Sequence, residues 1–164
     1  MTAVIIGNAA LIHGDALQEL KRFERDPVDM ILSDPPYKLT SGGKSGMMRG
    51  IFDPAEYDNG GSIVPCDIDW DDFMKPCYDA LREPGHAYFM ANNRNVQSML
   101  NSAEEAGFHF HNLLVWDKIT ATANRWYMKN LEFTGFFSKG NAFEINDCGA
   151  KQLIRVPKVD ESKD

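Results

Sequence analysis

Hydrophobic residues along the chain form two kinds of pattern, short unbroken runs and sets spaced three or four positions apart. The unbroken runs predict strands at residues 9–13, 28–32, 86–91, 108–116 and 131–138. The helically spaced sets predict helices at residues 17–23, 70–81 and 93–107. Strands that alternate with helices are typical of an α/β layered fold with a mainly parallel sheet.

Polar and turn-forming residues mark where these elements begin and end. Asp69 is the expected N-cap of the helix over 70–81, and Asn93 that of the following helix, which Gly107 closes. Glycine and proline are concentrated between residues 38 and 69. We expect a long loop there, and a loop of that length in a compact domain is usually functional or mobile.

Length and composition are those of a single globular domain. The chain has 164 residues, of which 43% are hydrophobic and 25% are charged. We expect one domain over residues 1–150 and a charged tail over residues 151–164. The sequence has no stretch approaching the roughly 20 apolar residues of a membrane span, and residues 1–12 lack the pattern of a signal peptide.

Charge and cysteine content further limit the possible functions and binding sites of the protein. The 17 basic and 24 acidic residues give a net charge of −7, which argues against a uniformly basic nucleic-acid binder but allows a local basic patch. The three cysteines lie far apart without Cys-x-x-Cys spacing, so neither a zinc cluster nor a disulfide framework is expected. A reducing cytoplasm is the expected location. His109 and His111 share a strand face without a third ligand, and no metal site is predicted.

The string Ser-Asp-Pro-Pro-Tyr at residues 33–37 directly follows the predicted strand at 28–32. In open α/β sheets, ligands bind beyond the carboxyl ends of the strands, so this position favours a functional role. The structural alternative is that the two prolines only end the strand, because proline lacks the N–H that a sheet needs.

The residues of this motif have the chemistry to hold an amino group of a nucleobase. Asp34 can accept one N–H and the carbonyl of Pro35 the other, which draws the nitrogen toward tetrahedral geometry and frees its lone pair. Pro35 and Pro36 fix the backbone that presents this carbonyl. Tyr37 offers a flat face on which a base flipped out of a duplex can stack.

Residues 28–37 resemble motif IV of the S-adenosylmethionine-dependent DNA amino-methyltransferases, which modify adenine N6 or cytosine N4. Weaker similarities to the same family lie at residues 14–17, 81–90, 115–118 and 130–140. The segment 115–118 resembles the family's Trp-x-Lys element, and residues 130–140 resemble its late Glu to Lys-Gly strand. The resemblance covers roughly residues 10–140.

This resemblance implies a Rossmann-like methyltransferase sheet with helices on both faces. It implies S-adenosylmethionine as the cofactor, with Asp15 and Asp34 near it, and double-stranded DNA as the substrate. Asp34, Pro35, Pro36 and Tyr37 would form the catalytic motif. Aspartate at the first motif position resembles the adenine-N6 branch, so a site-specific adenine methyltransferase is expected. Related motifs also serve guanine in rRNA and glutamine in proteins, which leaves the amine acceptor open.

The cofactor half of this family, with its Asp-Pro-Phe-x-Gly-Ser-Gly loop, has no counterpart in the sequence. The glycine-rich stretch at 41–46 follows motif IV and lacks the acidic and aromatic residues that lead into that loop. We therefore expect a truncated or split methyltransferase that lacks the C-terminal cofactor-binding half. A partner chain, self-association or another strand pairing would then cover the open edge of the strand at 28–32.

Basic residues near these segments are candidates for contacts with DNA: Lys38, Lys44, Arg49, Arg125 and Lys129. Trp126 and Tyr127 suit base stacking and a place in the core equally well. Two other functions stay open. The chain could be a non-enzymatic remnant of the fold that binds nucleic acid or regulates a partner, or a fragment of an rRNA methyltransferase.

Overall fold

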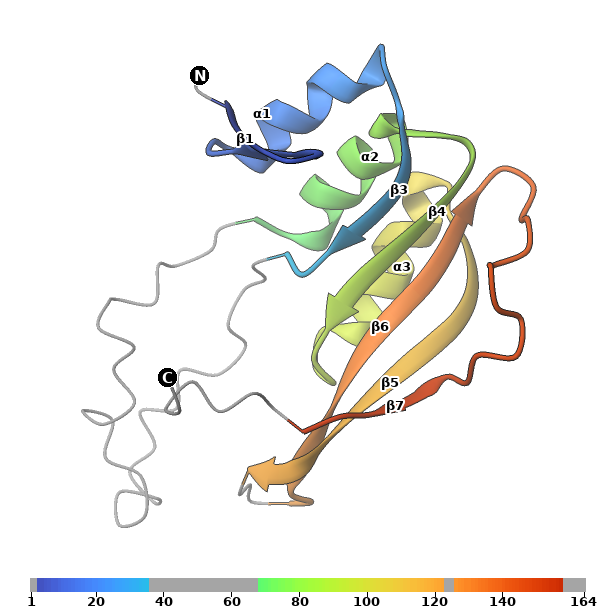
Figure 1. Cartoon of the computed structure of the whole chain (residues 1–164). Helices are drawn as coiled ribbons and strands as arrows, with labels where there is room; N and C mark the ends of the chain where they lie inside the picture. Colours follow the sequence, from blue (N-terminus) through green and yellow to red (C-terminus); the bar gives the residue numbers. More distant parts are fainter. Residues whose placement is uncertain (1–2, 36–67, 123–125, 158–164) are drawn as a thin grey trace.

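The structure, a computed structural model, describes residues 3–35, 68–122 and 126–157 (Figure 1). Its elements are β1 (Ala3–Ile6), β2 (Ala9–Ile12), α1 (Ala16–Leu20), the 3-10 helix η1 (Lys21–Glu24), β3 (Val28–Ser33), α2 (Trp70–Ala80), β4 (Leu81–Ala91), α3 (Val96–Ala106), β5 (His109–Thr122), β6 (Lys129–Lys139) and β7 (Leu153–Arg155). The strands and helices that the hydrophobic pattern predicts are confirmed. β1 and β7 occur in addition to them.

Five of the described strands form one sheet in the order β3-β4-β6-β5-β7. β3 runs parallel to β4 and β5 parallel to β7, whereas β6 is antiparallel to both of its neighbours. The sheet is therefore mixed, and the prediction of a mainly parallel sheet is wrong. β5 and β6 are consecutive in the chain, and strands joined by a short connection pair antiparallel, because a parallel pair needs a long crossover.

The helices among the described residues lie on one face of this sheet (Figure 1). Ala87 and Phe89 of β4 are fully buried on that face, in one core with Phe73 of α2 and Met99 of α3. Leu17 of α1 packs against the same core. The structure thus differs from the expected arrangement with helices on both faces, because α1 joins the side of α2 instead of covering the opposite side.

The opposite face of β3 and β4 is partly open to solvent. Met30 and Leu32 of β3 are 55% and 60% exposed, and Met90 at the end of β4 is 37% exposed. Farther from Met90, near the middle of β4, the His86 ring stacks on Phe143 with ring centroids 3.8 Å apart. The segment after β6 therefore covers one end of this face and leaves the end near Met90 accessible.

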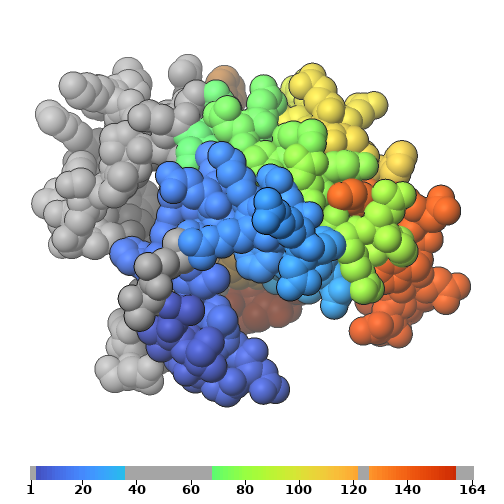
Figure 2. Space-filling view, turned by 90° about the horizontal axis from the view of Figure 1, so that it is seen from above, coloured from blue at the N-terminus to red at the C-terminus, as the bar shows by residue number. Residues whose placement is uncertain are grey.

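β1 and β2 form a separate antiparallel hairpin. Gly7 at its turn has a φ of +58°, a conformation that a two-residue hairpin turn requires and that glycine adopts without strain. All residues of both strands are exposed. Figure 2 shows the hairpin in dark blue at the edge of the molecule, with the lighter blue of α1 between it and the green of α2. Among the described residues, no helix has both the length and the hydrophobicity to cross a bilayer.

The helix ends follow local capping rules. Asp69 is the N-cap of α2, as predicted, and its backbone N–H donates to Asp72 Oδ2 at 3.2 Å. The cap of α3 is Asn95 and not the predicted Asn93, because the Asn92 side chain accepts from the Asn95 backbone N–H at 3.2 Å and holds the preceding turn. Gly107 ends α3 with a φ of +105°, as predicted.

Residues 153–155, predicted to belong to a charged tail, instead form the edge strand β7. The Val115 N–H donates to the Gln152 carbonyl at 2.8 Å, and β7 pairs in parallel with residues 115–117 of β5. The prediction of a tail from residue 151 is therefore wrong for this segment. Its apolar pair Leu153 and Ile154 provides two residues that suit a strand.

The Lys-Gly pair at the end of β6 has a structural role. Lys139 Nζ donates to the carbonyls of Tyr78 and Leu81, both at 2.7 Å, and lies 4.5 Å from the centroid of the Tyr78 ring. These carbonyls belong to the last turn of α2 and the residue just beyond the helix. A lysine at this position satisfies carbonyls that a helix leaves without partners, so Lys139 fastens α2 to the sheet.

Candidate active site

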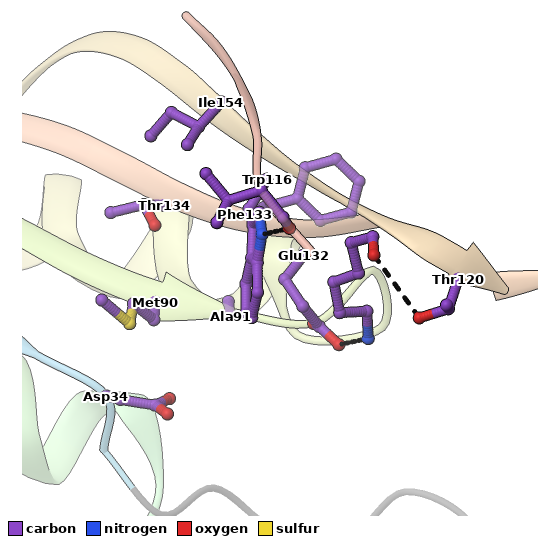
Figure 3. A pocket seen from close by; sticks show the side chains of 11 residues that line it. Asp34, Met90, Ala91, Trp116, Thr120, Glu132, Phe133, Thr134 and Ile154 are labelled. Carbon is purple, nitrogen blue, oxygen red and sulfur yellow. Dashed lines mark hydrogen bonds and ion pairs between the residues drawn. The ribbon is translucent and has the colours of Figure 1, made fainter. Parts of the chain in front are cut away.

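A cavity of about 640 Å³ opens at the carboxyl end of β3, on the face of the sheet without helices. Its walls come from β4, β5, β6, the β7 segment and the residue after β3. The lining residues are Asp34, Met90, Ala91, Trp116, Lys118, Thr120, Glu132, Phe133, Thr134, Ile154 and Val156. Figure 3 shows Asp34 on one side of this cavity and Trp116, Glu132 and Thr134 across from it.

Strand register explains why these side chains meet. Met90 lies opposite Thr134, and Glu132 lies opposite Trp116, which in turn lies opposite Ile154. Side chains of a strand alternate between the two faces of the sheet. Residues two apart on one strand therefore share a face, and so do residues that lie opposite each other on neighbouring strands. The cavity is thus built on rows of facing side chains that the pairing of the strands fixes.

Asp34 is the acidic residue at the carboxyl end of β3, one residue beyond the end of that strand. No donor of the described residues forms a hydrogen bond or ion pair with its carboxylate. Partial burial beside the cavity and, second, the negative charge of Glu132 raise the pKa of Asp34 above its ordinary value. Pro35 behind it is buried. The site therefore presents a carboxylate whose acceptor oxygens are available to a ligand.

The opposite wall carries an ion pair. Lys118 Nζ lies 2.8 Å from Glu132 Oε1, and the two side chains are 19% and 36% exposed. Glu132 occupies one of the three donors of the ammonium group, which leaves donors free for a ligand in the cavity. Beside the pair, the indole of Trp116 supplies a flat apolar surface.

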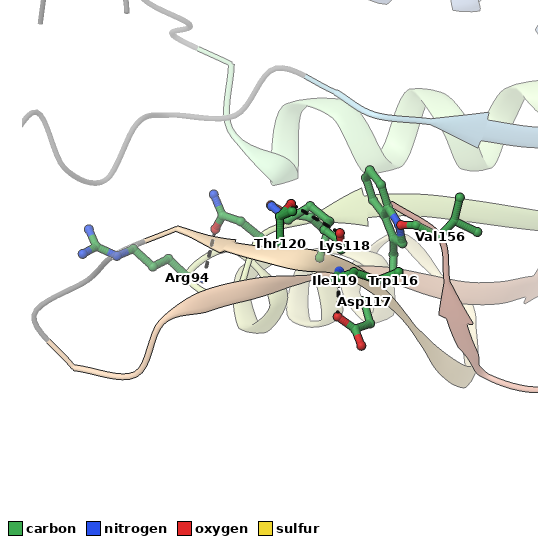
Figure 4. Close-up of polar contacts among 9 residues, drawn as sticks. Arg94, Trp116, Asp117, Lys118, Ile119, Thr120 and Val156 are labelled. Carbon is green, nitrogen blue, oxygen red and sulfur yellow. Dashed lines mark hydrogen bonds and ion pairs between the residues drawn. The ribbon is translucent and has the colours of Figure 1, made fainter. Parts of the chain in front are cut away.

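Asp117 lies on the far side of β5 from the cavity and organises the strand there. Figure 4 shows Trp116 and Asp117 leaving β5 on opposite sides. Asp117 accepts from the Ile119 backbone N–H at 3.0 Å, from Asn130 Nδ2 at 2.9 Å and from Arg155 Nε at 3.0 Å. The hydrogen bond from Ile119, followed by that from Asn130, holds the pKa of Asp117 below its ordinary value. This carboxylate therefore ties β5, β6 and β7 together.

Ile119, two residues after Asp117, has a strained backbone. Its φ is +67°, a conformation that costs a β-branched residue about 1–3 kcal/mol. The β5–β6 ladder is irregular between Asp117 and Thr122. Irregularities of this kind change the direction of side chains and are common beside active sites.

Three of the predicted site residues that are described lie outside the cavity lining: Asp15, Lys129 and Pro35, the neighbour of Asp34. Asp15 is the N-cap of α1, and its Oδ1 accepts from the Gln18 backbone N–H at 3.0 Å. Lys129 begins β6 and is half-buried. Trp126 and Tyr127 are 76% and 92% exposed, so neither is a core residue.

Several other predicted site residues lie outside the part of the chain that the structure describes: Pro36, Tyr37, Lys38, Lys44, Arg49 and Arg125. Their assignments stay predictions. Of the predicted catalytic motif, the structure therefore places Asp34 and Pro35.

The cavity also contains residues that were not predicted as site residues, above all Lys118 and Glu132. Both lie in segments noted for their family resemblance, but the strand pairing that brings them together is a tertiary feature. Period-two spacing of Trp116 and Lys118 on one strand was the available signal, since it places both on the same face.

The two strand histidines do not assemble a metal site. His111 Nε2 lies 2.9 Å from Ser138 Oγ, a contact within the sheet. Among the described residues, no group of three or more His, Cys, Asp and Glu side chains is arranged to hold a metal ion. Cys77 is buried in the core, which raises the pKa of its thiol to about 12.

Comparison with known proteins identifies relatives of the chain. No protein-family model matches it. The type II methyltransferase M2.LlaDCHI of Lactococcus lactis subsp. cremoris is 29% identical over 131 residues, which cover 71% of this chain. M2.DpnII of Streptococcus pneumoniae is 26% identical over 70% of the chain. The DNA adenine methyltransferase YhdJ of Escherichia coli is 34% identical over 93 residues, or 55% of the chain. Over part of its length the chain is therefore similar to DNA methyltransferases.

A solved structure has the same fold. The crystal structure of an M1.HpyAVI–SAM complex matches 90% of this chain with a TM-score of 0.59 at 19% identity, and 64% of that structure is covered. The Rossmann-like methyltransferase fold is thus confirmed. This chain spans 44% of M2.LlaDCHI, 43% of M2.DpnII and 28% of YhdJ, so it corresponds to less than half the length of each of these methyltransferase relatives.

Proposed function

We propose that this methyltransferase relative holds the target amine of a DNA methyltransferase that modifies adenine N6. The observation that carries the proposal is the position of Asp34. It follows the carboxyl end of β3, lies on a cavity large enough for a nucleobase, and accepts no hydrogen bond from the described residues. The DNA methyltransferases among its relatives support the same activity.

The proposed activation of the amino group depends on two hydrogen-bond acceptors, the Asp34 carboxylate and the Pro35 carbonyl. The lone pair of a nucleobase amino group is delocalised into the ring, so the nitrogen is a poor nucleophile. Asp34 accepts one N–H and the Pro35 carbonyl accepts the other, which localises the lone pair on nitrogen for attack. Tyr37 and Pro36 complete the motif, with Tyr37 stacking on the flipped base. Asp34 must be ionised to act, and its raised pKa sets the lower pH limit.

S-adenosylmethionine fits the charge of Asp34 in this site, whereas Asp15, the other residue proposed to hold it, lies outside the cavity lining. The positive charge of the cofactor is matched by the Asp34 carboxylate at the rim of an apolar cavity, and Asp15 Oδ2 is an acceptor that the capping bond through Oδ1 does not use. Asp34 and Asp15 are the residues that would hold it. When bound, the cofactor would supply the methyl group, and the residues of the chain would contribute mainly by positioning the amine.

Double-stranded DNA is the proposed substrate, with the adenine flipped into the cavity. Lys38, Lys44, Arg49, Arg125 and Lys129 are the proposed contacts to the phosphates. Within the described residues, β3 pairs only with β4, so one of its edges is open. Exposed edges of this kind are normally paired or covered, and a strand from a second chain or a second copy would complete the sheet.

Two measurements test the proposed function together. Titration calorimetry should show that the chain binds S-adenosylmethionine, and methyl label from that cofactor should appear on N6 of adenine in duplex DNA. If the label enters rRNA instead, the assignment of adenine in DNA as the methyl acceptor is wrong. If the chain binds DNA but neither binds the cofactor nor transfers label, it is a non-enzymatic module and the proposal is wrong.

A further inference from the structure

β5 changes its geometry at the point where it borders the cavity. Its pairing with β6 is irregular after Asp117, and Ile119 has a left-handed backbone held by the Asp117 carboxylate at 3.0 Å. Lys118 is the residue between these two. Strained backbone is concentrated at functional sites, where the surrounding structure holds it in place. The question is therefore what the side chain of Lys118 does.

Lys118 reaches into the cavity instead of into solvent. Its side chain is only 19% exposed, although a lysine at the end of a hairpin could extend freely into water. It lines the same cavity as Asp34 and pairs with Glu132 at 2.8 Å. The Lys118 ammonium therefore has a fixed position and unused donors that face a ligand of the cavity.

We propose that Lys118 is a specificity-determining residue that donates a hydrogen bond to a ring nitrogen of the amine substrate while Asp34 accepts from its amino group. This inference rests on the proposed function and adds the residue that recognises the ring. Glu132, which lines the same cavity, holds the ammonium group through their ion pair. Asp117 is a positioning residue, because it keeps Ile119 in the conformation that directs Lys118 into the cavity.

Adenine has the matching edge. Its amino group is flanked by ring nitrogens that accept hydrogen bonds, so a carboxylate and an ammonium group on opposite walls read donor and acceptor together. A ring that lacks the acceptor would leave the partly buried ammonium without this partner, and a lost hydrogen bond to a charged group is costly. The same arrangement does not depend on phosphates, which an inward-facing lysine is poorly placed to reach.

Binding of modified bases tests the proposal without requiring catalysis. The probe is a short oligothymidine strand with one central deoxyadenosine, compared with strands that carry 1-deazaadenine or 7-deazaadenine in its place. Affinities come from fluorescence anisotropy. We expect the wild-type chain to bind the adenine strand about tenfold more tightly than one of the deaza strands, and Lys118→Met to bind all of them equally.

A matched variant controls for loss of charge. Lys75→Met removes a lysine that is also ion-paired, with Asp79, but lies on α2 away from the cavity. It should keep the wild-type preference. Asp117→Ala should reduce the preference, whereas Arg155→Met, which removes only the outer partner of Asp117, should keep it. Because base preference is a ratio of affinities, a general loss of stability would not reproduce this pattern.

Three results would overturn the inference. The first is a wild-type chain that does not distinguish adenine from either deaza base. The second is a Lys118→Met variant that keeps the preference. The third is equal weakening on all strands with a smaller salt dependence, which would make Lys118 a phosphate contact. The proposed function fails separately if Asp34→Ala still distinguishes adenine from purine without the amino group.

Discussion

The indole Nε1–H of Trp116 donates a hydrogen bond to the carbonyl of Val156 at 2.8 Å, across 40 residues of sequence. The Val156 N–H donates back to the Asp117 carbonyl at 3.3 Å. Figure 4 shows the Trp116 indole beside Val156, and both residues line the cavity. The segment around β7 is therefore a wall of the candidate active site, and its attachment to β5 shapes that site.

Replacing Trp116 by Phe should loosen this wall. The change keeps an aromatic ring but removes the indole donor, so we expect a loss of about 1 kcal/mol in the free energy of unfolding. Amide exchange at Val156 should become faster. Urea unfolding and hydrogen exchange measure both effects. Val156→Ala is the control, since it leaves the carbonyl acceptor in place, and equal exchange in Trp116→Phe and wild type would refute the role of this bond.

Replacing Glu132 by Gln should shift the pH dependence of ligand binding to lower pH. Asp34 must be ionised to accept an N–H, and the charge of Glu132 helps to raise the pKa of Asp34. Removing that charge lowers this pKa, so the carboxylate persists to more acidic solution. Affinity for the adenine strand, measured as the pH is lowered, reports the shift. An exposed carboxylate outside the cavity, changed in Glu144→Gln, should leave the profile in place.

Acidification should destabilise the protein through His86. Burial lowers the pKa of His86, an effect that a hydrogen bond to the Phe143 backbone opposes and the nearby His111 strengthens. The unfolded chain therefore takes up the proton first, near pH 6.5. Stability is full above that pH and falls as the pH drops toward the lowered native value.

Urea titrations at several pH values between about 7 and 5 measure this loss. His86→Phe keeps a ring to stack on Phe143 and removes the titrating group. Its free energy of unfolding should fall less steeply with acidification than that of the wild type. An equal slope in both proteins would show that His86 is not the group responsible.

Much of the fold can be predicted from local sequence patterns, and the errors of that prediction have identifiable causes. Asp69 and Gly107 mark helix ends because capping is a property of neighbouring residues. The direction of β6, in contrast, follows from its short connection to β5, which the hydrophobic pattern of each strand taken alone does not take into account. β7 is three residues long and owes its place to pairing with β5, so the charge of the surrounding segment was a misleading guide.

The candidate site also contains some residues that local sequence predicts and others that only the tertiary structure brings together. Asp34 was predictable because its motif and its position after a buried strand are both local. Lys118 and Glu132 come from separate strands and meet only through the register of β5 with β6. The strained φ of Ile119 has no counterpart in sequence pattern, since isoleucine rarely adopts it.

The most direct test of this account is methyl transfer to adenine in duplex DNA by the Asp34→Asn variant. Asparagine keeps the size of the side chain but replaces the carboxylate, so the rate should fall by about 100-fold or more. Asp29→Asn is the matched control, because Asp29 lies on β3, the strand that Asp34 follows, is 78% exposed and pairs with Arg82 at the surface. An Asp34→Asn chain that methylates adenine as fast as the wild type and the Asp29→Asn control would contradict the account.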